Sequence, residues 1–285
     1  MVLKKKNVFV VYFSPAGSTR HVAEVIEKRF QVLGTEVSSF DLAEFNSDIS
    51  AKISRQMETS EGRSCLFIGS PVYASHAVQL VMECIAGLKE NPDVFAIPFV
   101  TWGGACSGIS LYEMGKELIS KKFTLLGAAK ILAVHSLMWQ LEDPLGKGHP
   151  DADDDRMVEE LVDHINQKIN EDKPEGIKLS DLAYQTKENH KEMEKTSLQI
   201  VKVHLPKRTI DTRMCNQCEV CSEVCPLDAV AFTPYPEFDE ECVFCFSCMK
   251  KCPEQAITAD MSAIWQRIRD RAAFFSEHPD SKIFY

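Results

Sequence analysis

The sequence predicts an α/β protein, with a five-stranded, parallel, doubly wound sheet followed by a small α+β domain that is rich in cysteine. Strand-like and helix-like segments alternate through the first half of the chain, and eight of the 11 cysteines fall between Cys215 and Cys252. A length of 285 residues is natural for two domains. We therefore divide the chain into a sheet domain (1–170), a linker or strap (171–205), a cysteine-rich domain (206–260) and a C-terminal helix and tail (261–285).

The elements of the first domain follow from apolar runs and helical spacing. Residues 7–13 are rich in Val and Phe and end at a Ser-Pro-Ala-Gly turn, which is typical of a buried parallel strand. In the next segment Val22, Ile26 and Phe30 fall on one helical face, and Gly34 ends the helix. We expect the further strands at 36–40, 64–69 and 94–102 and within 123–134, and the further helices at about 77–89, 108–121 and 151–169.

The loop after the first strand has the composition of a phosphate-binding turn. It leads directly into a helix and reads Ser14-Pro15-Ala16-Gly17-Ser18-Thr19. Its three hydroxyl side chains can point inward, Gly17 lets the backbone approach a ligand, and the helix start favours an anion. The glycine and lysine patterns of dinucleotide and triphosphate loops are missing, so a terminal monophosphate fits better. The alternative is a turn that only caps the helix.

This segment resembles the flavodoxin signature. The matching positions are Val10-Val11-Tyr12-Phe13-Ser14-Pro15-Ala16-Gly17-Ser18-Thr19, then Ala23 and Ile26. In that family the loop holds the phosphate of FMN. The resemblance therefore implies a flavodoxin-like domain that binds FMN through Ser14, Ala16, Gly17, Ser18 and Thr19.

The loops after the third and fourth strands are consistent with a flavin site, because flavodoxin-like proteins wrap the isoalloxazine ring with these two loops. The resemblance implies contacts from Pro71, Val72, Tyr73, Trp102, Gly103, Gly104 and Cys106. Tyr73 and Trp102 are candidates to flank the ring, since a flat aromatic face packs well on it. The alternatives are aromatic side chains that cover the edge of the core and, at Cys106, a buried thiol. Simple flavodoxins carry a Trp in the first of these loops and a Tyr in the second, so this chain departs from their pattern.

The cysteine-rich domain contains an internal repeat with a spacing of 27 residues. Both copies read C-x2-C-x2-C-x3-C-P and place their cysteines at 215, 218, 221 and 225 and at 242, 245, 248 and 252. This is the bacterial ferredoxin spacing, in which three close thiolates and a fourth from the other run hold each [4Fe–4S] cluster. Cluster 1 would take Cys215, Cys218, Cys221 and Cys252, and cluster 2 would take Cys242, Cys245, Cys248 and Cys225.

Other uses of cysteine fit this chain less well. Structural zinc needs four ligands and leaves the third cysteine of each run unused. Disulfides are rare in the cytoplasm, where we expect this protein because no signal peptide or membrane span is visible in the sequence. The net charge of −10 argues against nucleic acid as a partner.

The whole architecture resembles the flavodoxin–ferredoxin fusion proteins of anaerobic bacteria and archaea. This resemblance implies FMN, two [4Fe–4S] clusters and electron transfer to a redox protein partner. The alternative is a cluster-fed flavin reductase whose electron acceptor is a small molecule, such as a quinone, a tetrapyrrole or an unsaturated organic compound. An open cavity lined by loops 73–76, 102–108 and 135–149 would favour the reductase. No catalytic acid–base group stands out, and the tail 261–285 is expected to pack on the molecule or to form a homodimer contact.

Overall fold

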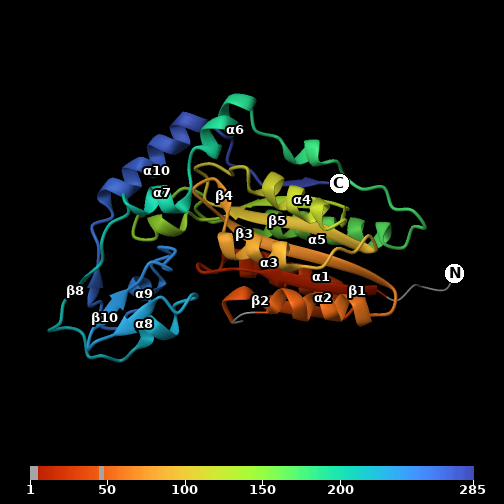
Figure 1. The fold of residues 1–285 in the computed structure, drawn as a ribbon. Helices are drawn as coiled ribbons and strands as arrows, with labels where there is room; N and C mark the ends of the chain where they lie inside the picture. The colour runs from red at the N-terminus through yellow and green to blue at the C-terminus, as the bar shows by residue number, and fades with distance from the viewer. Residues whose placement is uncertain (1–5, 45–47) are drawn as a thin grey trace.

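A computed structural model describes residues 6–44 and 48–285 of the chain (Figure 1). Its main sheet follows the order β12-β7-β5-β3-β1-β2, with β4 attached to β3 and β6 to β5. The strands of this sheet are β1 (Lys6–Tyr12), β2 (Val37–Asp41), β3 (Arg63–Tyr73), β4 (His76–Ala77), β5 (Val94–Trp102), β6 (Thr124–Leu125), β7 (Ala128–Leu132) and β12 (Lys282–Phe284).

The sheet is mainly parallel, as the sequence predicted, but within the described residues it has eight strands and not five. The strands β2, β1, β3, β5 and β7 run parallel to their neighbours. Two antiparallel strands were not expected: β4, a short return from β3, and β12, which adds the C-terminus to the edge at β7. The fifth expected strand is divided into β6 and β7. Gly127 lies between β6 and β7. A side chain there would collide with β12, because a Cβ atom on Gly127 would lie 2.9 Å from the carbonyl oxygen of Phe284.

Strand β3 is longer than the sequence suggested, because it continues through Ser70 and Pro71 where we expected a turn. Its neighbour β1 ends at Tyr12, which pairs with Gly69, while β5 stays paired with β3 as far as Pro71. Beyond Gly69 one edge of β3 is therefore open. A proline, which has no N–H group to donate, is tolerated at such an edge.

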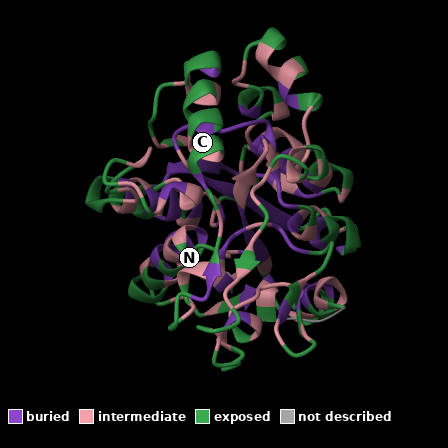
Figure 2. Cartoon of the chain, turned by 90° about the vertical axis from the view of Figure 1, so that its left-hand side faces the viewer, coloured by how far each residue is buried: buried purple, intermediate pink, exposed green. Residues whose placement is uncertain are grey.

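Helices cover both faces of the sheet, and Figure 2 shows the buried strands between them. Alternate residues of β1 face opposite layers: Val8 and Val10 pack with α1 and α5, and Phe9 and Val11 pack with α2, α3 and α4. We predicted no element at the position of α2. The helices of this domain are α1 (Ser18–Val32), α2 (Ile49–Thr59), α3 (Gln79–Gly87), α4 (Ser110–Ser120) and α5 (Ala152–Lys168).

The segment 171–205 is a strap that packs on the sheet domain. Leu182 and Met193 are buried in it, and the Thr196 hydroxyl donates a hydrogen bond to the carbonyl oxygen of Ala74 at 2.7 Å. Its short helical elements are a 3-10 turn at Leu179–Leu182, α6 (Lys187–Glu194) and α7 (Leu198–Lys202).

The cysteine-rich segment forms a small α+β unit with two similar halves. Strands β9 and β10 pair with each other, as do β8 and β11, and one short helix follows the second cysteine of each run. Its elements are β8 (Thr209–Ile210), α8 (Val220–Glu223), β9 (Val230–Phe232), β10 (Pro236–Phe238), α9 (Ser247–Lys250) and β11 (Ile257–Thr258).

After this unit, α10 (Ser262–Phe275) leads back to the sheet domain and to β12 (Figure 1). The buried ammonium group of Lys130 holds this return, with Glu277 and Asp280 each 2.9 Å away. None of the helices in the described part of the chain has the length and apolar character that crossing a bilayer requires.

Candidate functional site

The loop 14–19 presents the start of helix α1 without a side-chain cap. Gly17 precedes the helix in a left-handed conformation with φ of 97°, which favours glycine, and it offers no side chain to the first N–H groups. Ser14 Oγ accepts a hydrogen bond from the N–H of Arg20 at 2.9 Å. The hydroxyl of Thr19 lies 2.7 Å from that of Thr101, so this loop meets the end of β5.

A small hollow of about 50 Å³, here called the loop cavity, lies at these strand ends. It brings together predicted residues from all three loops: Ser14, Ala16, Ser18, Thr19, Pro71, Val72, Tyr73, Trp102 and Gly103. Of the other predicted residues, Gly17 and Gly104 do not line it and Cys106 lines the neighbouring cavity. Thr101 and the loop 133–136 also line it, although the sequence analysis did not name them as site residues.

Two of the predicted aromatic residues carry buried polar atoms without a partner. Among the described residues, no group forms a hydrogen bond with the Tyr73 hydroxyl or with Nε1 of Trp102. Trp102 is the last residue of β5, is 1% exposed and has the Lys130 ammonium 4.9 Å from the centroid of its ring. Buried donors normally have partners, so these two atoms are exceptions in residues that line the loop cavity.

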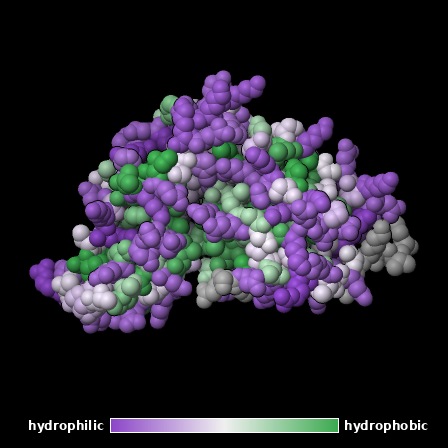
Figure 3. Space-filling view, in the orientation of Figure 1, coloured by the Kyte–Doolittle hydropathy of each residue, from purple (hydrophilic) through white to green (hydrophobic). Residues whose placement is uncertain are grey.

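A larger hollow of about 320 Å³ opens beside the loop cavity, and we call it the junction cavity. The two cavities share Val72, Tyr73, Gly103, His135 and Ser136. The sheet-domain loops form one side, and helices α7 and α10 with Val243 and Phe244 of the cysteine-rich unit form the others. Figure 3 shows hydrophobic side chains gathered on this face of the molecule around the meeting point of the two domains.

Burial sets the protonation of two groups in the shared wall. Burial, with a smaller contribution from Lys250, lowers the pKa of His135 to about 4, so its imidazole is neutral at pH 7. Burial raises the pKa of Cys106, which is therefore a thiol and not a thiolate. Gly103 lets His135 approach, because a Cβ atom at Gly103 would lie 2.7 Å from the imidazole ring.

The eight clustered cysteines line two small hollows, each with thiols from both runs. Cysteine group 1 consists of Cys215, Cys218, Cys221 and Cys252, and cysteine group 2 consists of Cys225, Cys242, Cys245 and Cys248. All eight are free. In the described part of the chain, no three cysteine sulfur atoms lie within 4.8 Å of one another.

The backbone around both groups repeats an unusual conformation. Six residues other than glycine have positive φ angles of 50° to 61°, in pairs 27 positions apart: Gln217 and Phe244, Glu219 and Phe246, and Asp228 and Gln255. Side chains disfavour this region, and such residues cluster where a structure needs them for function. These turns direct backbone N–H groups at the sulfur atoms, as in the contact of 3.3 Å from Phe244 N to Cys242 Sγ.

Cysteine group 2 has a cation beside it. The guanidinium of Arg208 donates to Cys242 Sγ at 3.3 Å and to Cys248 Sγ at 3.5 Å, and it stacks 3.6 Å from the centroid of the Phe238 ring. Arg208 lies seven positions before the first cysteine of the repeat and belongs to no motif. Sequence spacing therefore offers no signal that would have identified it.

Cysteine group 2 also lies against the loop 14–19. The Ser247 hydroxyl donates to the carbonyl oxygen of Pro15 at 2.8 Å, and Cys245 Sγ lies 3.4 Å from that hydroxyl. The sulfur and the carbonyl oxygen are thus at most 6.2 Å apart. Tyr73 packs in the same hydrophobic cluster as Val243 and Cys245. Burial, and then the nearby Cys245 and Cys242, raise the pKa of its hydroxyl.

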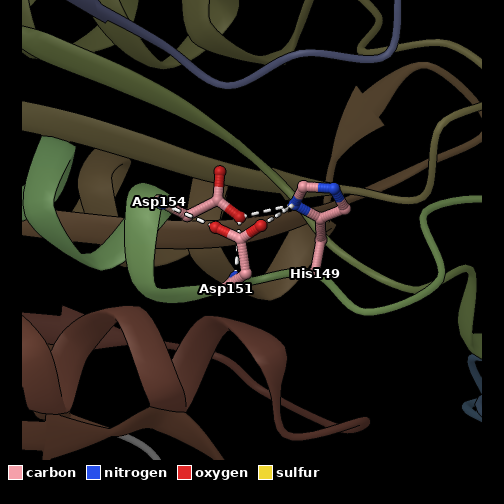
Figure 4. A group of neighbouring side chains, drawn as sticks. All are labelled: His149, Asp151 and Asp154. Atoms are coloured by element: carbon pink, nitrogen blue, oxygen red, sulfur yellow. Dashed lines mark hydrogen bonds and ion pairs between the residues drawn. The ribbon is translucent and has the colours of Figure 1, made fainter.

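A separate group of three ligand-type side chains lies at the start of α5 (Figure 4). His149 Nδ1 is 2.6 Å from Asp154, whose carboxylate also accepts from the N–H of Asp151 at 2.8 Å and from the Ser281 hydroxyl. The Asp151 carboxylate in turn caps the helix. These contacts form a capping box, and His149 adds a hydrogen bond to it. They explain why the three side chains lie together without a metal ion.

Comparisons with known proteins give likenesses of fold only to part of the chain. No family model matches the sequence, and no curated protein matches it. The rubredoxin oxygen:oxidoreductase of the anaerobe Desulfovibrio gigas is 17% identical over 59% of this chain and 37% of its own length, with a TM-score of 0.45. A flavodoxin from the domain Archaea is 14% identical over 58% of this chain and 99% of its own, with a TM-score of 0.41. An NADH:FMN oxidoreductase is 17% identical over 59% of this chain and 91% of its own, with a TM-score of 0.44.

These likenesses carry no argument about the function of this chain. Each has an identity below 25% and a TM-score below 0.5. The chain spans little more than a third of the length of the Desulfovibrio protein.

Proposed function

We propose that this chain is an electron-transfer protein that binds FMN and two [4Fe–4S] clusters and exchanges electrons with a redox partner. The observation that carries the proposal is the contact between cysteine group 2 and the loop 14–19, where Cys245 Sγ lies within 6.2 Å of the Pro15 carbonyl oxygen. Clusters carry single electrons, and FMN exchanges one or two. A chain that holds these centres side by side allows transfer without a collision between two proteins.

The residues of the loop cavity fit FMN. The start of α1, where Gly17 supplies no side-chain cap, and the hydroxyls of Ser14, Ser18 and Thr19 suit a phosphate. The side chains of Tyr73 and Trp102 line the same cavity and could pack against the remaining cofactor. The wall shared with the junction cavity offers the flat, partly apolar surface that an isoalloxazine ring requires.

The two cysteine groups fit iron–sulfur clusters better than zinc. Four thiolates around one zinc ion, at bonds of about 2.3 Å, place their sulfur atoms about 3.8 Å apart. Here no three cysteine sulfur atoms, all of them in described residues, lie within 4.8 Å of one another. The wider spacing leaves room for a larger inorganic centre, and the repeated positive-φ turns supply N–H donors for its negative charge.

The junction cavity favours a second candidate function, which is a cluster-fed reductase that acts on a small molecule. The hollow is lined by Tyr73, Ala74 and Ser75 and by parts of the loops near 103–106 and 135–137, which are the loops named for that alternative. Its volume of about 320 Å³ lies within the range of roughly 300–1,000 Å³ typical of a small-molecule pocket. A pure carrier has no need of such a space.

The experiment that tests the proposal is anaerobic purification of the full chain, followed by measurement of its iron, sulfide, zinc and FMN. We expect about eight irons, eight sulfides and one FMN per chain. A reductive titration followed by absorbance and electron paramagnetic resonance (EPR) should show the clusters and the flavin accepting electrons. Zinc in place of iron, or a chain that takes up no flavin, would refute the proposal.

A further inference from the structure

The junction cavity is a positively charged region in an acidic protein. Its lining contains two arginines, Arg267 and Arg271. No aspartate or glutamate occurs among the described residues that line it, although the chain has a net charge of −10. This cavity therefore differs from the rest of the molecule in the sign of charge that it would attract.

Arg271 is the cation placed deepest in this arrangement. Its guanidinium donates to the Ser75 hydroxyl at 2.5 Å and lies 4.8 Å from the centroid of the Phe275 ring. Burial lowers the pKa of Arg271, and the nearby Cys106 partly offsets this shift. No carboxylate among the described residues forms an ion pair with it, whereas Arg20, Arg29 and Lys130 each have one.

A partly buried guanidinium without a counter-ion is costly unless an anion joins it. Arg271 has five N–H groups, and one serves the neutral Ser75. A planar carboxylate can accept two parallel hydrogen bonds from such a fork. A phosphate dianion would need more donors than Arg271 offers alone. The other arginine of the lining, Arg267, is exposed at the rim of the cavity.

The rest of the cavity wall indicates which kind of ligand body would fit. It is mostly aliphatic and comes from four separate parts of the chain, and its members include Leu137, Leu198, Val201, Val243, Ile264 and Ile268. An apolar group buried there gains free energy in proportion to its area. The ligand that satisfies both the wall and Arg271 is therefore an organic acid with an apolar body.

We propose that the junction cavity binds a carboxylate with an apolar body, and that Arg271 forms the ion pair with its carboxylate group. This inference rests on the proposed function, because it names the class of molecule that would reach the flavin site through the shared wall. The Ser75 hydroxyl acts as a positioning group that holds the guanidinium toward the cavity.

Isothermal titration calorimetry on the full chain, loaded with cofactors and kept anaerobic, tests this proposal. The probes are trans-cinnamate, which has a carboxylate on an apolar body, and cinnamyl alcohol, which has the same body without the charge. We expect one cinnamate per chain and binding of the alcohol that is weaker by about tenfold or more. Arg271→Gln should reduce the affinity for cinnamate to that for the alcohol, and Arg271→Lys should fall between.

Arg269→Gln is the matched control, because Arg269 is an exposed arginine on the same helix α10 and does not line the junction cavity. It should change the affinity for cinnamate by less than about threefold. An unchanged affinity in Arg271→Gln, equal binding of the acid and the alcohol, or no binding of cinnamate below about 5 mM would each overturn the proposal.

Cofactor content separates this proposal from the one on which it rests. If Arg271→Gln keeps its iron but loses FMN, the guanidinium serves the flavin and the carboxylate proposal is wrong. If the unmodified chain takes up no FMN yet binds cinnamate through Arg271, the proposed function fails and the anion site stands.

Discussion

Replacing Arg208 by glutamine should lower the reduction potential of cluster 2 and leave that of cluster 1 unchanged. The guanidinium of Arg208 donates to Cys242 and Cys248, which belong to cysteine group 2. Reduction adds one negative charge to a cluster, and a nearby cation stabilises that charge. Loss of the cation therefore makes reduction harder at this group alone.

The size of the effect follows from the contact distances of 3.3 and 3.5 Å. With the charge about 6 Å from the centre of the cluster and an effective dielectric constant of about 20, the interaction is about 3 kcal/mol. About 1.4 kcal/mol corresponds to about 59 mV for one electron. Because Arg208 is partly exposed and solvent screens it, we expect a fall of about 50–100 mV.

The assay is a potentiometric titration of the anaerobic protein in which EPR resolves the two clusters. Arg213→Gln is the control, because Arg213 is also near the repeat but pairs with Asp211 and has a side chain that is 88% exposed. It should shift either potential by less than about 20 mV. Equal shifts of both clusters in Arg208→Gln, or no shift at all, would refute the reasoning from this contact.

Three further predictions concern the other parts of the site. Thr19→Val removes a hydroxyl from the loop cavity at constant volume, so FMN should bind about tenfold more weakly at unchanged iron content; unaltered binding in a fluorescence titration would contradict a role in holding phosphate. Cys252→Ala should lower iron from about eight to about four per chain and spare FMN, as iron and flavin assays would show, whereas equal loss of FMN would disprove independent sites. The hydrogen bond that His76 Nδ1 donates to the Glu113 carboxylate at 2.8 Å raises the pKa of His76, so this contact stabilises the fold fully below pH 6.5 and progressively less as the pH rises through the folded-state pKa. Urea unfolding of His76→Gln should accordingly lose that part of the pH dependence, and a pH profile identical to that of the parent chain would count against the contact.

The sequence by itself determined the local features whose chemistry depends on neighbours along the chain. The apolar runs predicted the parallel strands, because a strand buried on both faces needs continuous apolar residues. The loop 14–19 was identified because Gly17 and the hydroxyl residues act on the helix that begins beside them. The cysteine repeat predicted which thiols would be grouped, because each run holds its first three cysteines within seven residues.

The tertiary structure decided everything that depends on segments far apart in the chain. Helix α2 and strand β12 were not predicted. Strand β12 is only three residues long, and it forms because β7 offers it an open edge. Arg208 and Arg271 belong to no motif. Their roles follow from hydrogen bonds to Cys242 and Ser75, which are distant from them in the sequence. Periodicity reports which face of an element is buried but not which distant element covers it. The junction cavity, with walls from α7, α10 and both domains, could therefore be found only in the folded chain.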